Sequence, residues 1–325
     1  MEKTVMPAST TINDILRARR TVYKYLHPTP LYHYPTLSRL VGTDTWIKHE
    51  NHQPVGAFKV RGGLHLAAGL SEEQKQGGLY TASTGNHGQS IAFAARAFGI
   101  AATIAVPEGA NRGKIAAMEG LGAKVITHGE DFDTAREWIN NIAEERGGYF
   151  VGPTDEPLIQ GVGTYGLEIM EDLPEADVII VPVGAGSGVC GTAIAAKTLK
   201  PEIKIIGAQS AQAPTQQTCW QSGIMQSGPM ATVAEGLATR VPFANTQTLM
   251  RNLLDDFILV EDSAIEHAVY LLLEHTHNIA EEAGAASLAA ALQIRQKLEG
   301  KKTVLVISGG NIAPKRLQQI LMEHA

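Results

Sequence analysis

One lysine in this sequence has surroundings that suit nucleophilic amine chemistry. Lys59 lies in the segment Pro54–Gly63, directly after Phe58, among small and apolar residues with glycines on both sides. Burial in such surroundings disfavours the charged ammonium and lowers the pKa of a lysine. The neutral amine can then attack a carbonyl and form a Schiff base. Taken by itself, the segment is more typical of a surface lysine before a glycine turn than of a Schiff-base lysine. The assignment of this chemistry to Lys59 therefore depends on motifs elsewhere in the chain.

A second polar segment, Ser83–Gly88, follows a predicted strand and precedes a predicted helix. Ligands of open α/β sheets bind at this carboxyl end of the strands. Hydroxyls and N–H groups at a helix N-terminus suit an anion such as a substrate carboxylate. The side chain of Asn86 adds both a donor and an acceptor. The alternative interpretation is a polar helix cap with a glycine turn.

A glycine-rich run, Gly184–Gly188, follows an unbroken apolar strand and opens another predicted helix. This arrangement presents backbone N–H groups to a phosphate. A dinucleotide fingerprint is the main competitor, but it requires an acidic residue at the end of the next strand, where this chain has Gln209. A glycine loop without any ligand is the other alternative.

Two further segments follow the same logic. Ser308–Asn311 comes after a predicted buried strand, and its serine hydroxyl suits a heterocycle nitrogen, although a plain strand-ending turn is as consistent. Glu281–Ala285 carries two glutamates before a predicted helix, which is usually a solvated cap. A lysine, two anion-binding loops and a polar strand end together indicate a phosphorylated aldehyde cofactor bound to an amino acid.

The elements that position these residues alternate between strands and helices, which predicts parallel sheets with crossover helices. The apolar run Val178–Val183 is typical of a central strand buried on both faces. The other predicted strands are Thr45–His49, Gly78–Ala82, Ala101–Val106, Lys124–Thr127, Tyr149–Val151, Ile203–Ala208 and Thr303–Ile307. The predicted helices are Leu64–Leu70, Ile91–Phe98, Lys114–Leu121, Phe132–Glu145, Leu158–Glu171, Thr192–Leu199, Asp262–His275, Ala285–Leu298 and Pro314–Met322, with another after the capping-box pair Thr11 and Asp14.

Composition limits the class of protein. The 325 residues are enough for two lobes, and 44% hydrophobic with 18% charged residues fits a compact folded chain. The net charge of −6 gives no reason to expect nucleic acid or an anionic membrane as partner. Cys190 and Cys219 cannot form a disulfide framework, and Met1–Thr11 lacks the apolar core of a signal peptide. We therefore expect a cytoplasmic protein.

Over the range His27–Asn311 the sequence resembles the serine/threonine dehydratase and serine racemase family, pyridoxal-phosphate enzymes of fold type II, with the motifs in the family's order. The resemblance implies an α/β fold with two open parallel-sheet lobes flanked by helices and the cofactor, pyridoxal 5'-phosphate, in the cleft between them. It implies a large cofactor-binding domain of residues 1–65 and 150–325, a small substrate-closing domain of residues 66–149, and a homodimer.

The resemblance also assigns residues. Lys59 matches the lysine that holds the cofactor, and Lys59 and Thr84 are the predicted catalytic residues. The predicted cofactor-binding residues are Phe58, Lys59, Asn86, Gly184, Ala185, Gly186, Ser187, Gly188 and Ser308. The predicted substrate-binding residues are Ser83, Thr84, Gly85, Asn86 and His87.

Three departures from the family pattern matter. Ala185 and Ser187 interrupt the usual run of four glycines, which a cradle of N–H groups tolerates if both have negative φ. Thr84 stands where racemases usually have serine, so a second proton carrier opposite Lys59 is retained. Gln209–Thr215 lacks the carboxylates that bind a divalent cation in serine racemases, so no metal is expected there.

The chain ends at Ala325, so the regulatory domain of long threonine dehydratases, with its feedback control, is not expected.

The activity implied is β-elimination from a 3-hydroxy amino acid, L-threonine or L-serine first, to a 2-oxo acid and ammonia. Serine racemization and dehydration of 3-hydroxyaspartate or phenylserine stay open as alternatives. A catalytically silent amino-acid-binding protein is the alternative from a different class.

Overall fold

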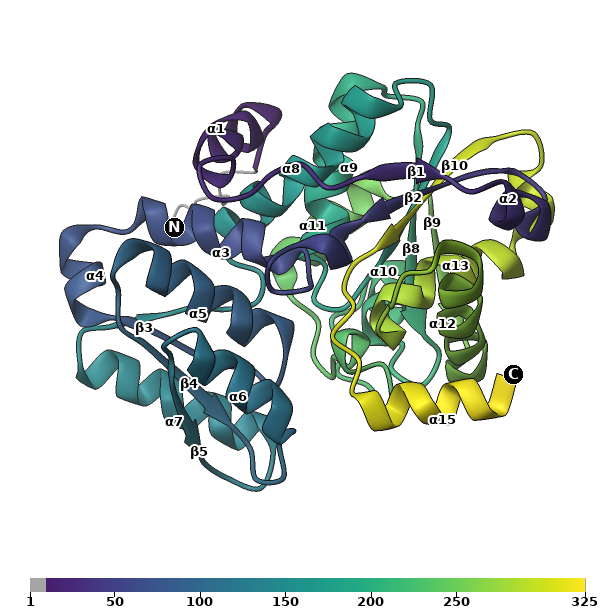
Figure 1. Ribbon diagram of the computed structural model, residues 1–325. Coiled ribbons are helices and arrows are strands. Elements are labelled where there is room, and N and C mark those ends of the chain that lie inside the picture. Colours follow the sequence, from purple (N-terminus) through teal and green to yellow (C-terminus); the bar gives the residue numbers. More distant parts are fainter. Residues whose placement is uncertain (1–9, 325) are drawn as a thin grey trace.

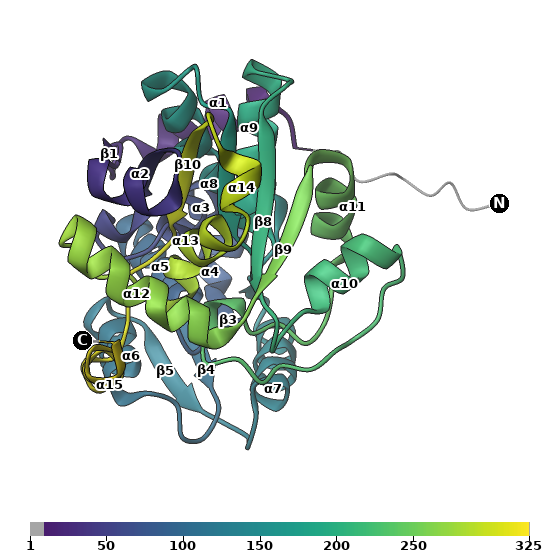
Figure 2. The ribbon, with the colours of Figure 1, turned by 90° about the vertical axis from the view of Figure 1, so that its right-hand side faces the viewer.

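The chain folds into two α/β lobes, each built on its own sheet (Figures 1 and 2). The computed structural model describes residues 10–324. Residues 1–9, which hold most of the segment examined for a signal peptide, and Ala325 lie outside the described part. None of the helices within residues 10–324 is both long and apolar enough to cross a membrane.

The larger sheet has six strands in the order β1-β2-β10-β7-β8-β9. Their bounds are β1 Leu31–His33, β2 Asp44–His49, β7 Val178–Pro182, β8 Lys204–Ser210, β9 Asp256–Val260 and β10 Lys302–Ile307. All neighbours pair in parallel except β1, which runs antiparallel to β2 at the edge. The prediction of an open parallel sheet is confirmed for β2, β10, β7 and β8, while the edge strands β1 and β9 were not predicted.

Residues 79–150 supply the smaller sheet, whose four parallel strands have the order β5-β4-β3-β6. Their bounds are β3 Leu79–Ala82, β4 Ala102–Val106, β5 Lys124–Thr127 and β6 Tyr149–Phe150. Figure 1 shows this lobe in blue to teal beside the larger one. All four strands were predicted to within about two residues.

Helices cover both faces of each sheet because neighbouring residues of a strand point to opposite sides. In the larger lobe Ile179 faces a core shared with α1, α8, α9 and α11, whereas Ile180 faces one shared with α2, α12 and α13. In the smaller lobe Leu79 packs toward α3, α5 and α6, and Tyr80 toward α7. These helices span α1 Ile12–Val22, α2 Pro35–Val41, α3 Lys59–Gly69, α5 Asn86–Phe98, α6 Arg112–Gly120, α7 Phe132–Glu145, α8 Glu156–Asp172, α9 Ser187–Leu199, α11 Ala244–Leu253, α12 Asp262–Thr276 and α13 Glu282–Gln293.

The remaining helices are α4 Glu72–Gly77, α10 Thr215–Ser222, α14 Arg295–Leu298, α15 Pro314–His324 and the short 3₁₀ turns η1 Glu50–His52 and η2 Glu235–Leu237. Several helices differ from prediction. Helices α5 and α9 begin about five residues before their predicted starts, and α2, α4 and α11 were not predicted. Three further differences concern α3, α13 and α10. Helix α3 begins at Lys59 rather than near Leu64, the predicted Ala285–Leu298 helix is divided at Ile294, and α10 lies in a stretch for which no element was predicted. The capping box of Thr11 and Asp14 is confirmed.

Candidate active site

Lys59 is the first residue of α3, and the segment before it is joined to the end of β10. The N–H of Phe58 donates to the carbonyl of Ser308 (3.1 Å), and the N–H of Gly310 donates to the carbonyl of Gly56 (2.9 Å). A bridge between Ala57 and Gly309 completes the pairing. Two predicted motifs, about 250 residues apart in the sequence, therefore form one structural unit.

The side chain of Lys59 is partly buried, with Nζ 5.2 Å from the centre of the Phe58 ring. Burial lowers the pKa of Lys59 to about 8, and the carboxylate of Glu281 partly opposes this change. A substantial fraction of the amine is therefore neutral near pH 8, as a nucleophile or general base requires. The lysine is partly rather than fully buried, and its lowered pKa has the direction expected from the sequence.

The glycine-rich loop lies between β7 and α9, against Phe58. A Cβ built on Gly188 would lie 3.3 Å from the ring of Phe58, and one on Gly184 would lie 2.2 Å from the carbonyl oxygen of Gly236. Gly186 has a φ of 102°, whereas Ala185 and Ser187 are not among the residues with positive φ. Ala185 and Ser187 therefore have the negative φ that a cradle of backbone N–H groups requires at non-glycine positions. The first N–H groups of α9 have no partner within the helix, which leaves them free for an anion.

The turn before α5 is organised by Ser83. Its hydroxyl oxygen accepts bonds from the N–H groups of Gly85 (3.2 Å) and Gly88 (2.9 Å). The ring of His87 contacts Thr81 and the carbonyl of Val151 within the small lobe. The side chains of Ser83 and His87 thus shape the turn. The groups left for a substrate are the hydroxyl of partly exposed Thr84 and the backbone N–H groups that begin the helix.

Asn86 connects this turn to the larger lobe. Its side-chain amide donates to Glu281 (2.6 Å) and accepts from Asn311 (2.8 Å). Glu281 and Glu282 were interpreted as a solvated cap, and that interpretation is wrong, because they are only 8% and 7% exposed. Asn311 belongs to a motif that was singled out, but no role was assigned to it.

A buried network of ion pairs stabilises the first turn of α3. The guanidinium of Arg61 contacts both carboxylate oxygens of Glu50 (2.7 and 2.8 Å) and of Glu168 (2.6 and 2.8 Å). Lys48 forms an additional ion pair with Glu168 (2.6 Å), and all four side chains are at most 2% exposed. Burial opposes the charges, but Arg61 and Lys48 outweigh it and lower the pKa of Glu168. Since Arg61 lies two residues after Lys59, the network holds the start of the helix that carries the lysine.

Ion pairs also connect the two lobes beside this site. Lys114 of α6 pairs with Glu235 of η2, and Arg240 lies 3.8 Å from Asp133 of α7. Arg240 could not be placed from the sequence. These pairs are partly exposed, so each contributes little to stability, but they lie where closure of one lobe on the other would form or break them.

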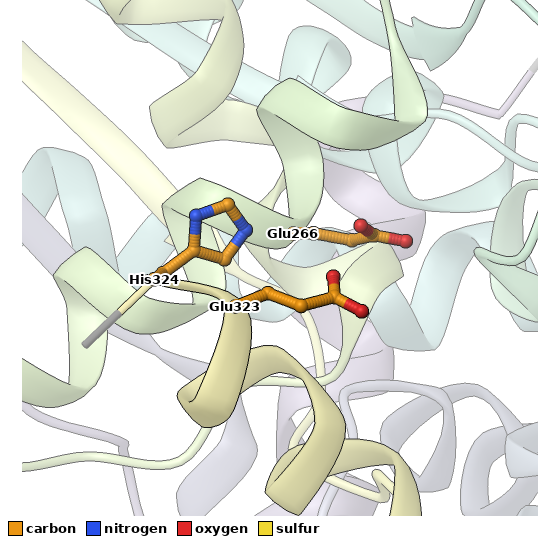
Figure 3. A group of neighbouring side chains, drawn as sticks. All are labelled: Glu266, Glu323 and His324. Carbon is orange, nitrogen blue, oxygen red and sulfur yellow. The ribbon is translucent and has the colours of Figure 1, made fainter.

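The described residues also contain a group of potential metal ligands on the outer helices α12 and α15, formed by Glu266, Glu323 and His324 (Figure 3). Glu266 is already paired with Arg316, which also binds Glu282. Acidic groups of this kind are common on surfaces without an ion, and the cluster plays no part in the site described above.

The assembled groups fit a phosphorylated pyridine aldehyde. The partly buried amine of Lys59 suits the aldehyde, and the N–H groups of the glycine-rich loop suit the phosphate. Ser187 and Ser308 are 3% and 6% exposed, and neither hydroxyl bonds to another residue within 10–324. Both are therefore available to a ligand, Ser187 in the loop and Ser308 at the strand end beside Lys59.

Comparison with known proteins supports this class of enzyme. Residues 22–310 match the family model described as pyridoxal-phosphate dependent enzyme. The chain belongs to this family, and pyridoxal phosphate is its cofactor. Within the family it groups with the threonine dehydratases and serine racemases of fold type II.

Three relatives carry that grouping. The L-threonine ammonia-lyase of Thermotoga maritima is 40% identical, over 96% of this chain and 78% of its own. The catabolic L-threonine dehydratase TdcB of Staphylococcus aureus is 37% identical, over 96% of this chain and 92% of its own. The structure of maize serine racemase superposes with a TM-score of 0.92 at 32% identity, covering 98% of each chain.

Two buried histidines predict an acid-dependent loss of stability. Burial, with the charge of Lys59, lowers the pKa of His87 from 6.5 to about 3, and burial lowers that of His49 to about 4. Both rings stay neutral in the folded protein but gain a proton on unfolding below pH 6.5. The contribution of the two histidines to the free energy of unfolding is therefore complete above about pH 6.5. It falls by about 1 kcal/mol per histidine between pH 6.5 and 5.5.

Urea unfolding of the apoprotein across this pH range checks the effect. The readout is the difference between the wild type and the double variant His49→Gln/His87→Gln, because the raised pKa of Glu281 acts in the opposite direction. The variant is expected to lose stability more gradually as the pH falls. An equal pH dependence in both proteins would contradict the prediction.

Proposed function

We propose that this enzyme catalyses β-elimination of a 3-hydroxy amino acid, with L-threonine and L-serine as substrates, to a 2-oxo acid and ammonia. The observation that carries the proposal is the meeting of a partly buried lysine amine, a glycine-rich loop and a serine hydroxyl that has no partner among residues 10–324, opposite the Asn86 turn. The two relatives named as threonine ammonia-lyase and threonine dehydratase support the choice of substrate.

Pyridoxal phosphate, when bound, supplies the electron sink for negative charge at the substrate Cα. In our proposal the N–H groups of Gly184–Gly188 and the hydroxyl of Ser187 bind its phosphate, Phe58 packs beside it, and Asn86 faces its phenolic oxygen. Ser308 faces the ring nitrogen. A hydroxyl does not protonate that nitrogen as a carboxylic acid does, which favours prompt loss of the β-hydroxyl over a lasting charge at Cα.

The remaining residues act on the substrate. We assign the substrate carboxylate to the turn Ser83–His87, through its N–H groups and the hydroxyl of Thr84. Nζ of Lys59 takes the proton from Cα as general base, and the β-hydroxyl leaves as water with a proton donated by a nearby hydroxyl or by the ammonium formed at Nζ. Hydrolysis of the released product then gives the 2-oxo acid and ammonia.

A racemase is the second candidate. The hydroxyl of Thr84 is partly exposed in the turn that reaches toward the larger lobe, and a hydroxyl there can return a proton to Cα from the side opposite Lys59. The structural match to maize serine racemase supports keeping this activity in view.

The test is a substrate panel for the purified protein loaded with pyridoxal phosphate. We expect rapid 2-oxo acid release from L-threonine and L-serine, and slower release from D-serine, threo-3-hydroxyaspartate and phenylserine. Chiral chromatography of the serine reactions measures racemization in the same samples. Conversion of L-serine to D-serine without 2-oxo acid would replace elimination by racemization, and no turnover of any member would favour a silent binding protein.

We also propose the domain division implied by the resemblance, with residues 66–149 closing on the substrate and residues 1–65 and 150–325 holding the cofactor. The separate four-stranded sheet of residues 79–150 supports it. Closure would exclude water from the reacting groups. A cytoplasmic location fits the two buried free cysteines, and the homodimer stays a prediction.

A further inference from the structure

The side-chain amide of Asn86 is bonded at both ends to residues of the larger lobe. The acceptor that fixes the whole arrangement is the backbone carbonyl of Val55, which binds Nδ2 of Asn311 (2.8 Å). The same Nδ2 donates to Oδ1 of Asn86 (2.8 Å), so the other end of the Asn86 amide, Nδ2, is turned toward Oε1 of Glu281 (2.6 Å). A flipped Asn86 would set oxygen against a carboxylate and NH₂ against NH₂, so one orientation is strongly favoured.

Two glycines, Gly56 and Gly309, make space for the side chains that bond to Asn86. A Cβ on Gly309 would lie 2.5 Å from Oε1 of Glu281 and 3.1 Å from Nδ2 of Asn86. A Cβ on Gly56 would lie 2.6 Å from Oδ1 of Asn311, and Gly56 has a φ of 67°, which few other residues adopt. The N–H of Glu281 donates to the carbonyl of Gly309 (3.0 Å). The contacts to Asn86 thus depend on the same strand end that adjoins Lys59.

We propose that Glu281 and Asn311 are positioning residues that hold the Asn86 amide in one orientation, with its second N–H free for the phenolic oxygen of pyridoxal phosphate. The inference rests on the cofactor-facing role proposed above for Asn86. An NH₂ group has two hydrogens, and Glu281 takes one. Because a carboxylate acceptor makes a charge-assisted bond, it holds the amide more firmly than a neutral acceptor would.

The charges around Glu281 support its placement in the site rather than in a structural ion pair. Burial raises the pKa of Glu281 to about 7, the charge of Lys114 and the bond from Asn86 oppose this, and Glu282 and Glu235 add to it. Its carboxylate acts in turn on the amine of Lys59. The next residue, Glu282, is equally buried but is bonded to Arg316 (2.9 Å), so it serves as a matched control.

The experiment measures the dissociation constant of pyridoxal phosphate from the apoprotein by absorbance titration at pH 8. We expect Glu281→Gln and Asn311→Ala each to weaken binding by roughly tenfold. Glu281→Gln replaces a charge-assisted bond to Asn86 with a weaker neutral one, and Asn311→Ala removes the bond to its other end. Glu282→Gln is expected to change the constant less than about twofold, since it removes no contact to Asn86. Thermal unfolding of each apoprotein shows whether the variant is folded.

Repeating both substitutions in an Asn86→Ala background separates positioning from a general structural role. If the two residues act through Asn86, their effects largely disappear there. Effects of full size in that background would overturn the proposal. If Asn86→Ala weakens binding but Glu281→Gln and Asn311→Ala do not, the positioning role fails while the site stands. If Asn86→Ala itself leaves binding unchanged, the proposed role of Asn86 fails and the inference with it.

Discussion

Replacing Lys59 with alanine is expected to reduce 2-oxo acid formation from L-threonine by at least about a thousandfold, because one nitrogen is proposed both to hold the cofactor and to move the Cα proton. Its partly buried amine has a pKa lowered to about 8, so a substantial fraction of it is neutral near pH 8. Lys59→Arg is expected to be as inactive, since a guanidinium stays protonated.

Borohydride reduction followed by peptide mass mapping provides a second readout. In the wild type we expect pyridoxal phosphate to be fixed to the peptide that contains Lys59. In Lys59→Ala no peptide should carry it, and an added small primary amine should restore part of the activity. Lys75→Ala, on the surface of α4, is the control and should be labelled at Lys59 as in the wild type. Labelling at another lysine, or turnover at the wild-type rate in Lys59→Ala, would contradict the assignment.

Replacing Arg61 with leucine is expected to lower the free energy of unfolding of the apoprotein by about 3–5 kcal/mol, because it leaves buried carboxylates without their main partner. Arg61 makes four bonds to Glu50 and Glu168 and is 0% exposed. Burial opposes its charge, yet the two carboxylates outweigh burial and raise its pKa. Lys48 alone cannot neutralise both acids.

Urea unfolding of the apoprotein at pH 7.5 measures this loss. Arg61→Lys keeps the charge but cannot bind two carboxylates bidentately, so its loss should be intermediate. The control is Lys75→Leu, which breaks a partly exposed pair with Glu72 and should change stability by less than about 1 kcal/mol. A loss for Arg61→Leu as small as that of the control would show that the network is dispensable.

The proposed closure of residues 66–149 on the rest of the chain would link these features to the reaction. Asn86 and Thr84 belong to the smaller lobe, whereas Lys59, Ser308 and the glycine-rich loop belong to the segments around the larger sheet. The bonds from Asn86 to Glu281 and Asn311, with the pairs Lys114–Glu235 and Asp133–Arg240, hold the lobes together in this structure.

The sequence alone determined the local features. Alternating apolar runs and turns predicted all four strands of the smaller sheet and the central strands of the larger one, because strand and helix periods are encoded within a few residues. The order of strands and helices then predicted that Lys59, the Asn86 turn, the glycine-rich loop and Ser308 would meet, since the carboxyl ends of parallel strands share one edge. The structure brings these four together.

Only the tertiary structure decided which side chains are partners. Asn86 and Glu281 are 195 residues apart, Asn86 and Asn311 are 225 apart, and Arg61 and Glu168 are 107 apart. No local period relates such pairs. A glutamate before a helix is solvated or buried according to what packs over it, and for Glu281 that is decided by the strand end at Gly309 and by the smaller lobe. The residues that we propose for the chemistry lie in motifs visible in the local pattern, although each motif alone left alternatives open, whereas the residues that hold them in place depend on packing between distant segments.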